Sequence, residues 1–266
     1  MSIIDAIVLG LVQGLTEFIP VSSSGHLVIV SHLLGVGDAF TFDTLLNFGT
    51  LLALVIYYRK RIWSLITRVF KGKDWKLLGQ LIAATIPALI AGVLFASQIE
   101  KLNNMIWVVI FMLVSIGIIM VVAGKANKDA DDREIEQSVS WPIAVKIGLI
   151  QAVALIPGSS RSGVTILMGL RNNLSAARAA EFSFLLAIPI LAGGSLKMLV
   201  SSKGQAFLQD NISVLLIGNL VAFISGMLAI SFLLKLLGTR GLKDFGWYRI
   251  GLGGVLAILL ITGIIS

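Results

Sequence analysis

The stretch GLVQGLTEFIPVSSSGHLVIV, from Gly10 to Val30, decides how this chain folds. It places a carboxylate (Glu17), three consecutive serines and a histidine (His26) within sequence that is otherwise apolar enough for lipid. An ionised side chain at bilayer depth costs about 2.5–3.5 kcal/mol even on the more permissive insertion scale. Polar residues in such a position therefore indicate a functional site.

Pro20 divides this stretch into two helical pieces. Gln13 and Glu17 are four residues apart, which places them on one face of the first piece. The residue before a proline disfavours helical geometry, so we expect a break there and a second helix that starts near Gly25. Free amides at the start of that helix, next to serine hydroxyls, favour binding of a phosphate or another anion.

A second segment, Gly148–Leu170 (GLIQAVALIPGSSRSGVTILMGL), repeats this plan 138 residues later. The shared order is a glutamine, a break, a serine-rich turn, a glycine and then a carboxylate. The matching pairs are Gly10 and Gly148, Leu11 and Leu149, Gln13 and Gln151, Ser22 and Ser160, Ser24 and Ser162, Gly25 and Gly163, and Asp43 and Glu181. The sequence therefore predicts one membrane domain, 1–266, with internal repeats at approximately 1–125 and 139–266.

The composition is that of a polytopic membrane protein. Of 266 residues, 57% are hydrophobic and 13% are charged, against about 25% charged in an ordinary soluble domain. We expect an all-α bundle, because a membrane β-barrel would need short alternating segments, which the sequence lacks. The net charge of +7 does not indicate a nucleic-acid partner, because the basic residues cluster in loops. The absence of cysteine excludes disulfides and thiol chemistry, and the start MSIIDA lacks the basic region of a cleaved signal peptide.

Six uncharged runs are long enough, alone or with flanking residues, to be transmembrane helices. They are Thr44–Tyr58, Leu77–Ile99, Leu102–Gly124, Phe182–Leu196, Asn211–Leu234 and Ile250–Ser266. In the two serine-rich segments the piece after the break, such as Ser24–Leu34, covers only about 16–20 Å, too little for a bilayer about 30 Å thick. We therefore expect six transmembrane helices plus two re-entrant helical hairpins.

The basic residues predict the orientation of these helices. The densest group lies between the first two spans and comprises Arg59, Lys60, Arg61, Arg68, Lys71, Lys73 and Lys76. With that loop in the cytoplasm, the other cytoplasmic segments hold Lys125, Lys128, Arg133, Lys235, Arg240 and Lys243, and the outer loops only Lys101 and Lys203. This asymmetry places both termini outside.

Three spans separate the two hairpins, so the hairpins would enter from opposite faces and their tips would meet near the midplane. That arrangement is an inverted-topology repeat, which many secondary transporters share. The hydrophilic segment Ala126–Gln137 is expected to be a solvated link between the halves.

The two tips together offer what hydrolysis of a phosphate ester requires. Arg161 supplies a guanidinium that can hold phosphate through two parallel hydrogen bonds. Ser23 is the candidate nucleophile, with Glu17 or His26 as its base, and His26 is also the candidate acid. Substrate contacts are expected from Gln13, Ser22, Ser24, Gly25, Ser160, Ser162 and Thr165, with Ser159 in the same turn.

Structural roles for these residues also remain open. Serines in membrane helices commonly bond to the backbone or to a neighbouring helix, and Glu17 and Arg161 could form a buried structural ion pair. His32 lies outside the turn and is expected to be a packing or interfacial residue. Asp43 and Glu181 could shape the site or cap helices, and the repeat does not choose between these roles.

These motifs resemble those of a known bacterial membrane family, the bacitracin-resistance type of undecaprenyl-diphosphate phosphatase. The resemblance rests on QGLTEFIPVSSSGH at Gln13–His26, PGSSRSGVT at Pro157–Thr165 and AEFSFLLAIP at Ala180–Pro189, and it covers essentially the whole chain. It implies hydrolysis of undecaprenyl diphosphate to the monophosphate and inorganic phosphate, for lipid recycling in cell-wall synthesis and for bacitracin resistance. It also implies a multi-pass protein of the bacterial inner membrane with its active site facing outside.

Matched residue by residue, the family's (E/Q)xxxE motif lies at Gln13 and Glu17, its serine at Ser23 and its histidine at His26. Its phosphate-binding arginine is Arg161. The resemblance also implies a Mg²⁺ or Ca²⁺ requirement with Glu17 as the favoured ligand. Position 13 is glutamine, and a neutral amide is a poorer ligand for a hard cation than a carboxylate. The metal requirement therefore transfers less securely.

Two rival functions fit parts of the pattern. A lipid or small-anion transporter or flippase would use the inverted repeat, although a carrier has no use for a nucleophile and base. An acid-phosphatase-like lipid phosphatase would use the Ser24–His26 tripeptide, but it needs a later histidine, and none follows His32. The sequence does not choose between a phosphoserine intermediate and direct attack by water, and it leaves a homodimer open.

Overall fold

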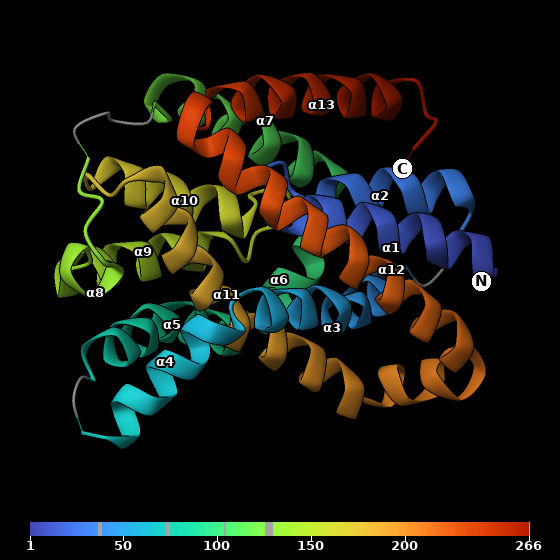
Figure 1. Cartoon of the computed structure of the whole chain (residues 1–266). Coiled ribbons are helices and arrows are strands. Elements are labelled where there is room, and N and C mark those ends of the chain that lie inside the picture. The colour runs from blue at the N-terminus through green and yellow to red at the C-terminus, as the bar shows by residue number, and fades with distance from the viewer. Residues whose placement is uncertain (37–38, 73–74, 104, 126–129, 266) are drawn as a thin grey trace.

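The computed structural model describes residues 1–36, 39–72, 75–103, 105–125 and 130–265. Over these residues the fold is helical, with no strand beyond an isolated bridge between Asp131 and Leu174. Six of the described helices are long and apolar enough to cross a membrane. The all-α polytopic class is therefore confirmed (Figure 1).

The six long helices coincide with the predicted spans but differ at their ends. They are α3 (Ala39–Tyr57), α5 (Lys76–Leu94), α7 (Ile106–Ala123), α11 (Ala176–Val200), α12 (Ser202–Arg240) and α13 (Lys243–Ile261). The predicted run to Ile99 stops early, because the chain leaves α5 at Phe95 and turns into the short polar helix α6 (Ala96–Asn103). Asn211, the predicted start of a span, is instead a kink inside α12, with φ −131° and its amide donating to the carbonyl of Phe207. Ser266 lies outside the described residues.

The two serine-rich segments each form a helical hairpin. The first is α1 (Ile3–Phe18) and α2 (Ser23–Leu34), and the second is α9 (Trp141–Val153) and α10 (Arg161–Arg171). The helix α1 ends two residues before Pro20, as the restricted backbone before proline predicts. In Figure 1 the hairpins occupy opposite sides of the molecule. Their re-entrant placement in a bilayer stays a prediction.

The helix order recurs along the chain. The helices α9, α10, α11 and α13 begin 138, 138, 137 and 137 residues after α1, α2, α3 and α7. Their packing corresponds as well, because α1 lies on α12 and α9 lies on α5, while α7 lies beside α13. Glycine permits the close approach in both hairpins, since a Cβ at Gly10 would strike the backbone of Gly218, and one at Gly148 the backbone of Ala84.

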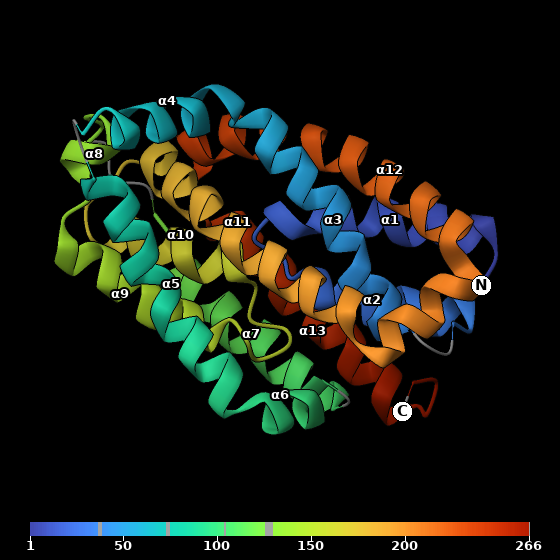
Figure 2. The ribbon, with the colours of Figure 1, turned by 90° about the horizontal axis from the view of Figure 1, so that it is seen from below.

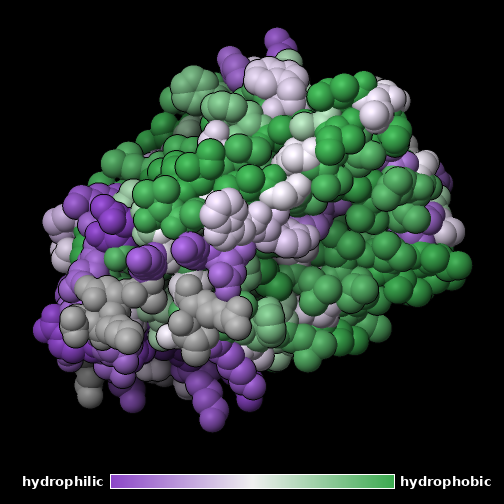
Figure 3. Space-filling model, turned by 90° about the horizontal axis from the view of Figure 1, so that it is seen from above, coloured by the Kyte–Doolittle hydropathy of each residue, from purple (hydrophilic) through white to green (hydrophobic). Residues whose placement is uncertain are grey.

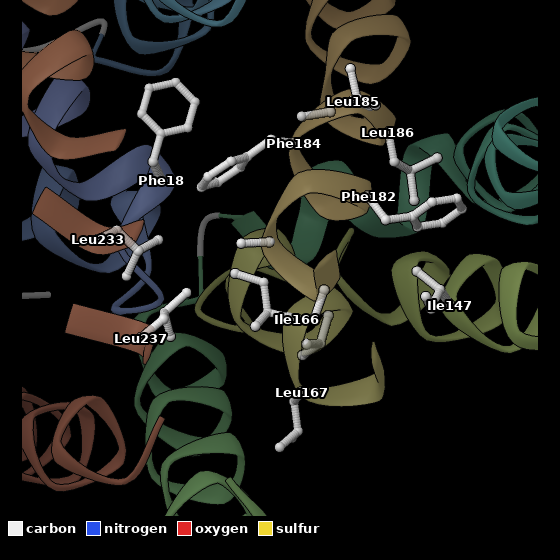
Figure 4. Packing of buried hydrophobic residues seen from close by; sticks show 14 of the residues in the cluster. Phe18, Ile147, Ile166, Leu167, Phe182, Phe184, Leu185, Leu186, Leu233 and Leu237 are labelled. Atoms are coloured by element: carbon white, nitrogen blue, oxygen red, sulfur yellow. The ribbon is translucent and has the colours of Figure 1, made fainter. Parts of the chain in front are cut away.

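The largest cluster of buried apolar residues joins the two hairpins through α11, which crosses the centre of the molecule beside α3 (Figure 2). Figure 4 shows Phe18 at the end of α1 facing Phe184 of α11. These two rings meet edge to face with their centroids 5.7 Å apart, an arrangement favoured by the ring quadrupoles. Leu233 of α12 and Ile166 of α10 belong to the same cluster. Packing at Phe18 fixes the position of its neighbour, Glu17.

The link between the halves is less solvated than the sequence predicted. Residues 126–129 lie outside the described part, but α8 (Ile135–Ser138) folds onto the protein with Ile135 fully buried. Glu136 accepts from Arg61 at 2.6 Å and from Arg68 at 3.1 Å, both in α4 (Arg59–Phe70). The expectation of a solvated link is therefore wrong at α8, where Ile135 is buried and the ion pairs of Glu136 attach the link to α4.

The polar end of the molecule is the end that carries α8. Most hydrophilic residues on the face shown in Figure 3 gather there, while the rest of that face is mainly hydrophobic. Both termini lie toward the opposite end (Figures 1 and 2). The two ends of the molecule thus differ in hydropathy and in which elements they carry.

Candidate active site

The two hairpin turns share one local geometry. Ser22 and Ser160 both have positive φ, 76° and 66°, a backbone region that non-glycine residues seldom adopt. Each caps the helix that follows, with its hydroxyl accepting from the amide of Gly25 or Gly163 at 3.4 and 3.2 Å. Each hydroxyl also pairs with that of the serine two residues later, Ser24 or Ser162. Both turns therefore present a pair of hydroxyls at a helix N-terminus.

The two turns meet in space. The Gly158 amide of the second turn donates to Ser24 Oγ of the first at 3.1 Å. In the other direction, Ser162 Oγ donates to the backbone carbonyl of Glu17 at 3.3 Å. Residues separated by more than 130 positions in the chain thus form one polar centre.

The Glu17 carboxylate connects the side chains of this centre through its hydrogen bonds. Its Oε1 accepts from Arg161 Nη2 at 2.8 Å, and its Oε2 accepts from Ser23 Oγ at 2.8 Å and from Gln13 Nε2 at 3.2 Å. The side chains of Glu17 and Arg161 are 11% and 10% exposed. A hydroxyl that donates to a carboxylate beside a guanidinium is the arrangement of a nucleophile, a base and an anion-binding cation.

Buried polar residues hold these groups in place. Gln13 also donates to Asn47 Oδ1 of α3 at 2.7 Å. Thr165 donates to the carbonyl of Arg161 at 2.7 Å and shares a 2.6 Å hydrogen bond with the Ser183 hydroxyl of α11. Among the predicted substrate-contact residues, the side chains with little or no exposure are Gln13, Ser22, Ser162 and Thr165. In this conformation those four support the site, whereas Ser23, Ser24, Ser160 and Arg161 keep partial exposure.

His26 faces a residue that the sequence did not indicate. Its Nδ1 lies 2.8 Å from the carbonyl of Ser22, and its Nε2 lies 2.8 Å from the Tyr248 hydroxyl of α13. Both ring nitrogens thus have partners other than Ser23 or Glu17. His32 lies apart from the centre, where its Nε2 contacts the carbonyl of Ile264 at 2.6 Å.

Arg249 was also missed by sequence reasoning. It is fully buried and donates to the carbonyls of Pro20, Gly158 and Ser159 at 3.4, 2.7 and 3.1 Å. One guanidinium therefore joins the first turn to the second. An arginine near the start of an apolar span is ordinarily interpreted as an interfacial anchor, so its sequence context gave no local signal.

The two carboxylates paired by the repeat have different surroundings. Glu181 Oε1 lies 2.9 Å from Arg61 Nε in an ion pair, and its Oε2 accepts a hydrogen bond from Arg178 at 3.0 Å. Glu181 therefore belongs to the network of ion pairs that includes Glu136 of α8. Asp43 Oδ1 is buried and has no hydrogen-bond partner among the described residues. Neither carboxylate contacts the Glu17 centre through a hydrogen bond within the described part.

The donors around Glu17 do not fit a resident divalent cation. Over the described ranges, no three His, Asp or Glu side chains gather as a metal site would require. The Glu17 carboxylate shares its oxygens with a guanidinium, and its other polar neighbours include the neutral amide of Gln13. Mg²⁺ and Ca²⁺ prefer several oxygen ligands, mainly carboxylates.

Residues 6–255 match the family described as "Bacitracin resistance protein BacA". The chain belongs to this family. Its relatives include proteins named undecaprenyl-diphosphatase from Porphyromonas gingivalis (39% identical, covering 99% of both chains), Chlorobaculum tepidum (41%, 99% of both) and Bdellovibrio bacteriovorus (37%, 99% of this chain and 98% of the relative). The predicted family is confirmed.

Proposed function

We propose that this chain is an undecaprenyl-diphosphate phosphatase, which hydrolyses undecaprenyl diphosphate to undecaprenyl phosphate and inorganic phosphate. The observation that carries the proposal is the Glu17 carboxylate, which binds the Ser23 hydroxyl and the Arg161 guanidinium at 2.8 Å each. Full-length relatives with the name undecaprenyl-diphosphatase support the substrate class. The mainly hydrophobic face shown in Figure 3 suits a protein that contacts lipid, where the prenyl tail of the substrate would stay.

Substrate binding would exchange the partner of Arg161. Arg161 now pairs with Glu17, and a terminal phosphate would take its place on the guanidinium through two parallel hydrogen bonds. Glu17 would then keep Ser23 as its hydrogen-bond donor and become free to accept a proton. Arg161, together with amides at the two helix N-termini, would stabilise the charge that develops on the phosphoryl oxygens, which is usually the largest single contribution to catalysis.

In the reaction, Ser23 Oγ attacks the terminal phosphorus while Glu17 accepts the hydroxyl proton. The bond between that phosphorus and the bridging oxygen breaks, its electron pair stays on the bridging oxygen, and undecaprenyl phosphate leaves as an anion. Water then attacks the phosphorus on Ser23 while the lone pair of His26 Nε2 accepts a proton from that water, and Glu17 returns its proton to Ser23 Oγ as phosphate leaves. In the alternative route water attacks directly, and Ser23 orients it. Detection of phosphoserine at position 23 by mass spectrometry after acid quench would distinguish the two routes.

No step of this mechanism passes through a metal ion, because the side chains around Glu17 do not form a cation site. A need for Mg²⁺ or Ca²⁺ stays a proposal for the reaction as a whole. The comparison of phosphate release with and without a chelator tests it.

The proposed orientation places the site on the outer side of the bacterial inner membrane. Three observations support this orientation: the basic loops, both termini toward the end opposite α8, and the uneven surface. In this orientation the hairpins are re-entrant, since α2 and α10 have 12 and 11 residues, too few to span. Labelling of single cysteines introduced at Ser2 and at Arg133, in intact cells with an impermeant reagent, tests this topology.

The activity test is phosphate release by purified protein from undecaprenyl diphosphate. The variants are Glu17→Ala, Ser23→Ala, His26→Ala and Arg161→Ala, each checked for monodisperse folding. We expect large losses for all four. Near wild-type turnover in all four would end the proposal. The same preparations give the oligomeric state, including the homodimer that the sequence leaves open.

A lipid or small-anion transporter is the second candidate, favoured by the recurrence of helices 137–138 residues apart. Movement of a labelled prenyl phosphate across liposomes without phosphate release would favour it. Phosphate release without movement favours the phosphatase.

A further inference from the structure

Two consecutive residues of α13 contact the first hairpin turn in different ways. Arg249 is buried and donates to the carbonyl of Pro20, whereas Tyr248 is 50% exposed and its hydroxyl lies 2.8 Å from His26 Nε2. We propose that Tyr248 is a positioning residue that fixes the tautomer and the orientation of the His26 ring. The proposal rests on the proposed function to the extent that His26 takes part in the reaction.

The tautomer follows from the two hydrogen bonds of the imidazole. A backbone carbonyl can only accept, so the 2.8 Å contact between His26 Nδ1 and the Ser22 carbonyl places the proton on Nδ1. In the neutral ring the lone pair is then on Nε2. Tyr248 can donate its hydroxyl proton to that lone pair, which completes a consistent pair of bonds. Rotating the ring by half a turn would break both bonds.

Packing and hydrogen bonds around α13 hold the Tyr248 side chain against His26. The Tyr248 and His26 rings lie within 4° of parallel, with their centroids 5.6 Å apart. Arg249 prevents α13 from sliding along the turn, because its guanidinium also binds the carbonyls of Gly158 and Ser159. A side chain held by packing and by a neighbouring hydrogen-bond network is placed more accurately than one on a free loop.

The orientation of His26 matters because of where it lies on α2. Ser23 and His26 are three residues apart, which puts them on one face of the helix. Because Nδ1 is bonded to the Ser22 carbonyl, the Nε2 lone pair is the group of this ring that can accept a proton. Without Tyr248 the Nε2 atom could carry the proton in the other tautomer or turn away from the substrate.

The first test detects the protonation of the His26 ring directly and does not depend on the protein being an active phosphatase. The chain has two histidines, so ¹⁵N-histidine labelling gives two pairs of ring-nitrogen signals, one pair per imidazole, and His32→Gln assigns them. We expect His26 to be protonated at Nδ1 and unprotonated at Nε2 in the wild type. Tyr248→Phe keeps the ring but removes the hydroxyl, so it should shift the Nε2 signal or produce a mixture of tautomers. A proton on Nε2 in the wild type, or an unchanged His26 signal in Tyr248→Phe, refutes the proposal.

The second test asks whether Tyr248 acts through His26. Loss of one hydrogen bond predicts a fall in kcat of about tenfold for Tyr248→Phe, with little change in KM. In a His26→Ala background the same substitution should have no further effect. Trp247→Phe, at the exposed neighbouring position, is the control and should keep wild-type turnover. Equal losses with and without His26 would refute action through the histidine.

The two tests separate the two proposals. If the purified wild type releases no phosphate from undecaprenyl diphosphate, the proposed function fails, and the ¹⁵N spectra still decide whether Tyr248 positions His26. If the wild type is active and the spectra do not change, the positioning proposal alone fails.

Discussion

Replacing Glu17 with glutamine separates catalysis from structure at the centre of the site. The amide keeps the shape of the side chain but cannot take the proton of Ser23, and its nitrogen would face either Arg161 or Gln13, which are both donors. Loss of a general base lowers turnover by about 10²–10⁴-fold. Removing one partner of a buried ion pair also destabilises a protein by about 3–5 kcal/mol. The side chains of this pair keep 10–11% exposure, and this residual contact with water should keep the loss of stability toward the lower end of the 3–5 kcal/mol range.

The double variant Glu17→Gln/Arg161→Gln distinguishes the two effects. It leaves no unpaired charge, so the unfolding temperature, followed by tryptophan fluorescence, should recover most of the loss seen in Glu17→Gln. Phosphate release should stay as low as in the single variant, because both the base and the phosphate-binding cation are absent. Turnover of Glu17→Gln within twofold of wild type would refute the assignment of Glu17 as base. Recovery of activity in the double variant would show that the pair is structural.

Three further variants test the fold around the site by thermal unfolding. Arg249→Met should lower stability by about 3 kcal/mol or more, because it removes charged hydrogen bonds and leaves buried carbonyls unpaired. An unchanged melting temperature would show that Arg249 does not hold the two turns together. Gly148→Val should destabilise by about 1–3 kcal/mol through its clash with Ala84, and Gly193→Ala, at an open position, is the matched control. Glu136→Gln should lower stability and reduce its dependence on salt, because Arg61 and Arg68 lose their shared partner; equal salt dependence of variant and wild type would refute this.

Local signals made most of the fold predictable. The long apolar runs and the break at Pro20 depend on neighbouring residues only, and both features reappear in the structure close to their expected positions. Helix ends were less predictable. Phe95 and Asn211 interrupt apolar runs by a turn and by a kink, and composition alone does not distinguish these from continuous helix.

The candidate site was only partly predictable, for a physical reason. Glu17, Ser23 and Arg161 were expected to converge because the tips of the two hairpins were expected to meet near the midplane, and costly polar groups in apolar sequence indicated a functional site there. Tyr248 and Arg249 gave no such signal, since an aromatic and a basic residue at the beginning of a span are common at membrane interfaces. Their roles depend on contacts with turns 91–229 residues away in the chain.

The hydrogen bonds from Arg249 to the two turns also bear on the order in which the protein is assembled. During synthesis the turns at Pro20 and at Gly158 are made long before α13, so their carbonyls must find water or other temporary partners in the meantime. The nascent chain therefore carries an unfinished polar centre through most of membrane insertion. The last helix completes the polar centre, so a chain truncated before Lys243 would lack both the Arg249 hydrogen bonds to the two turns and the partner of His26.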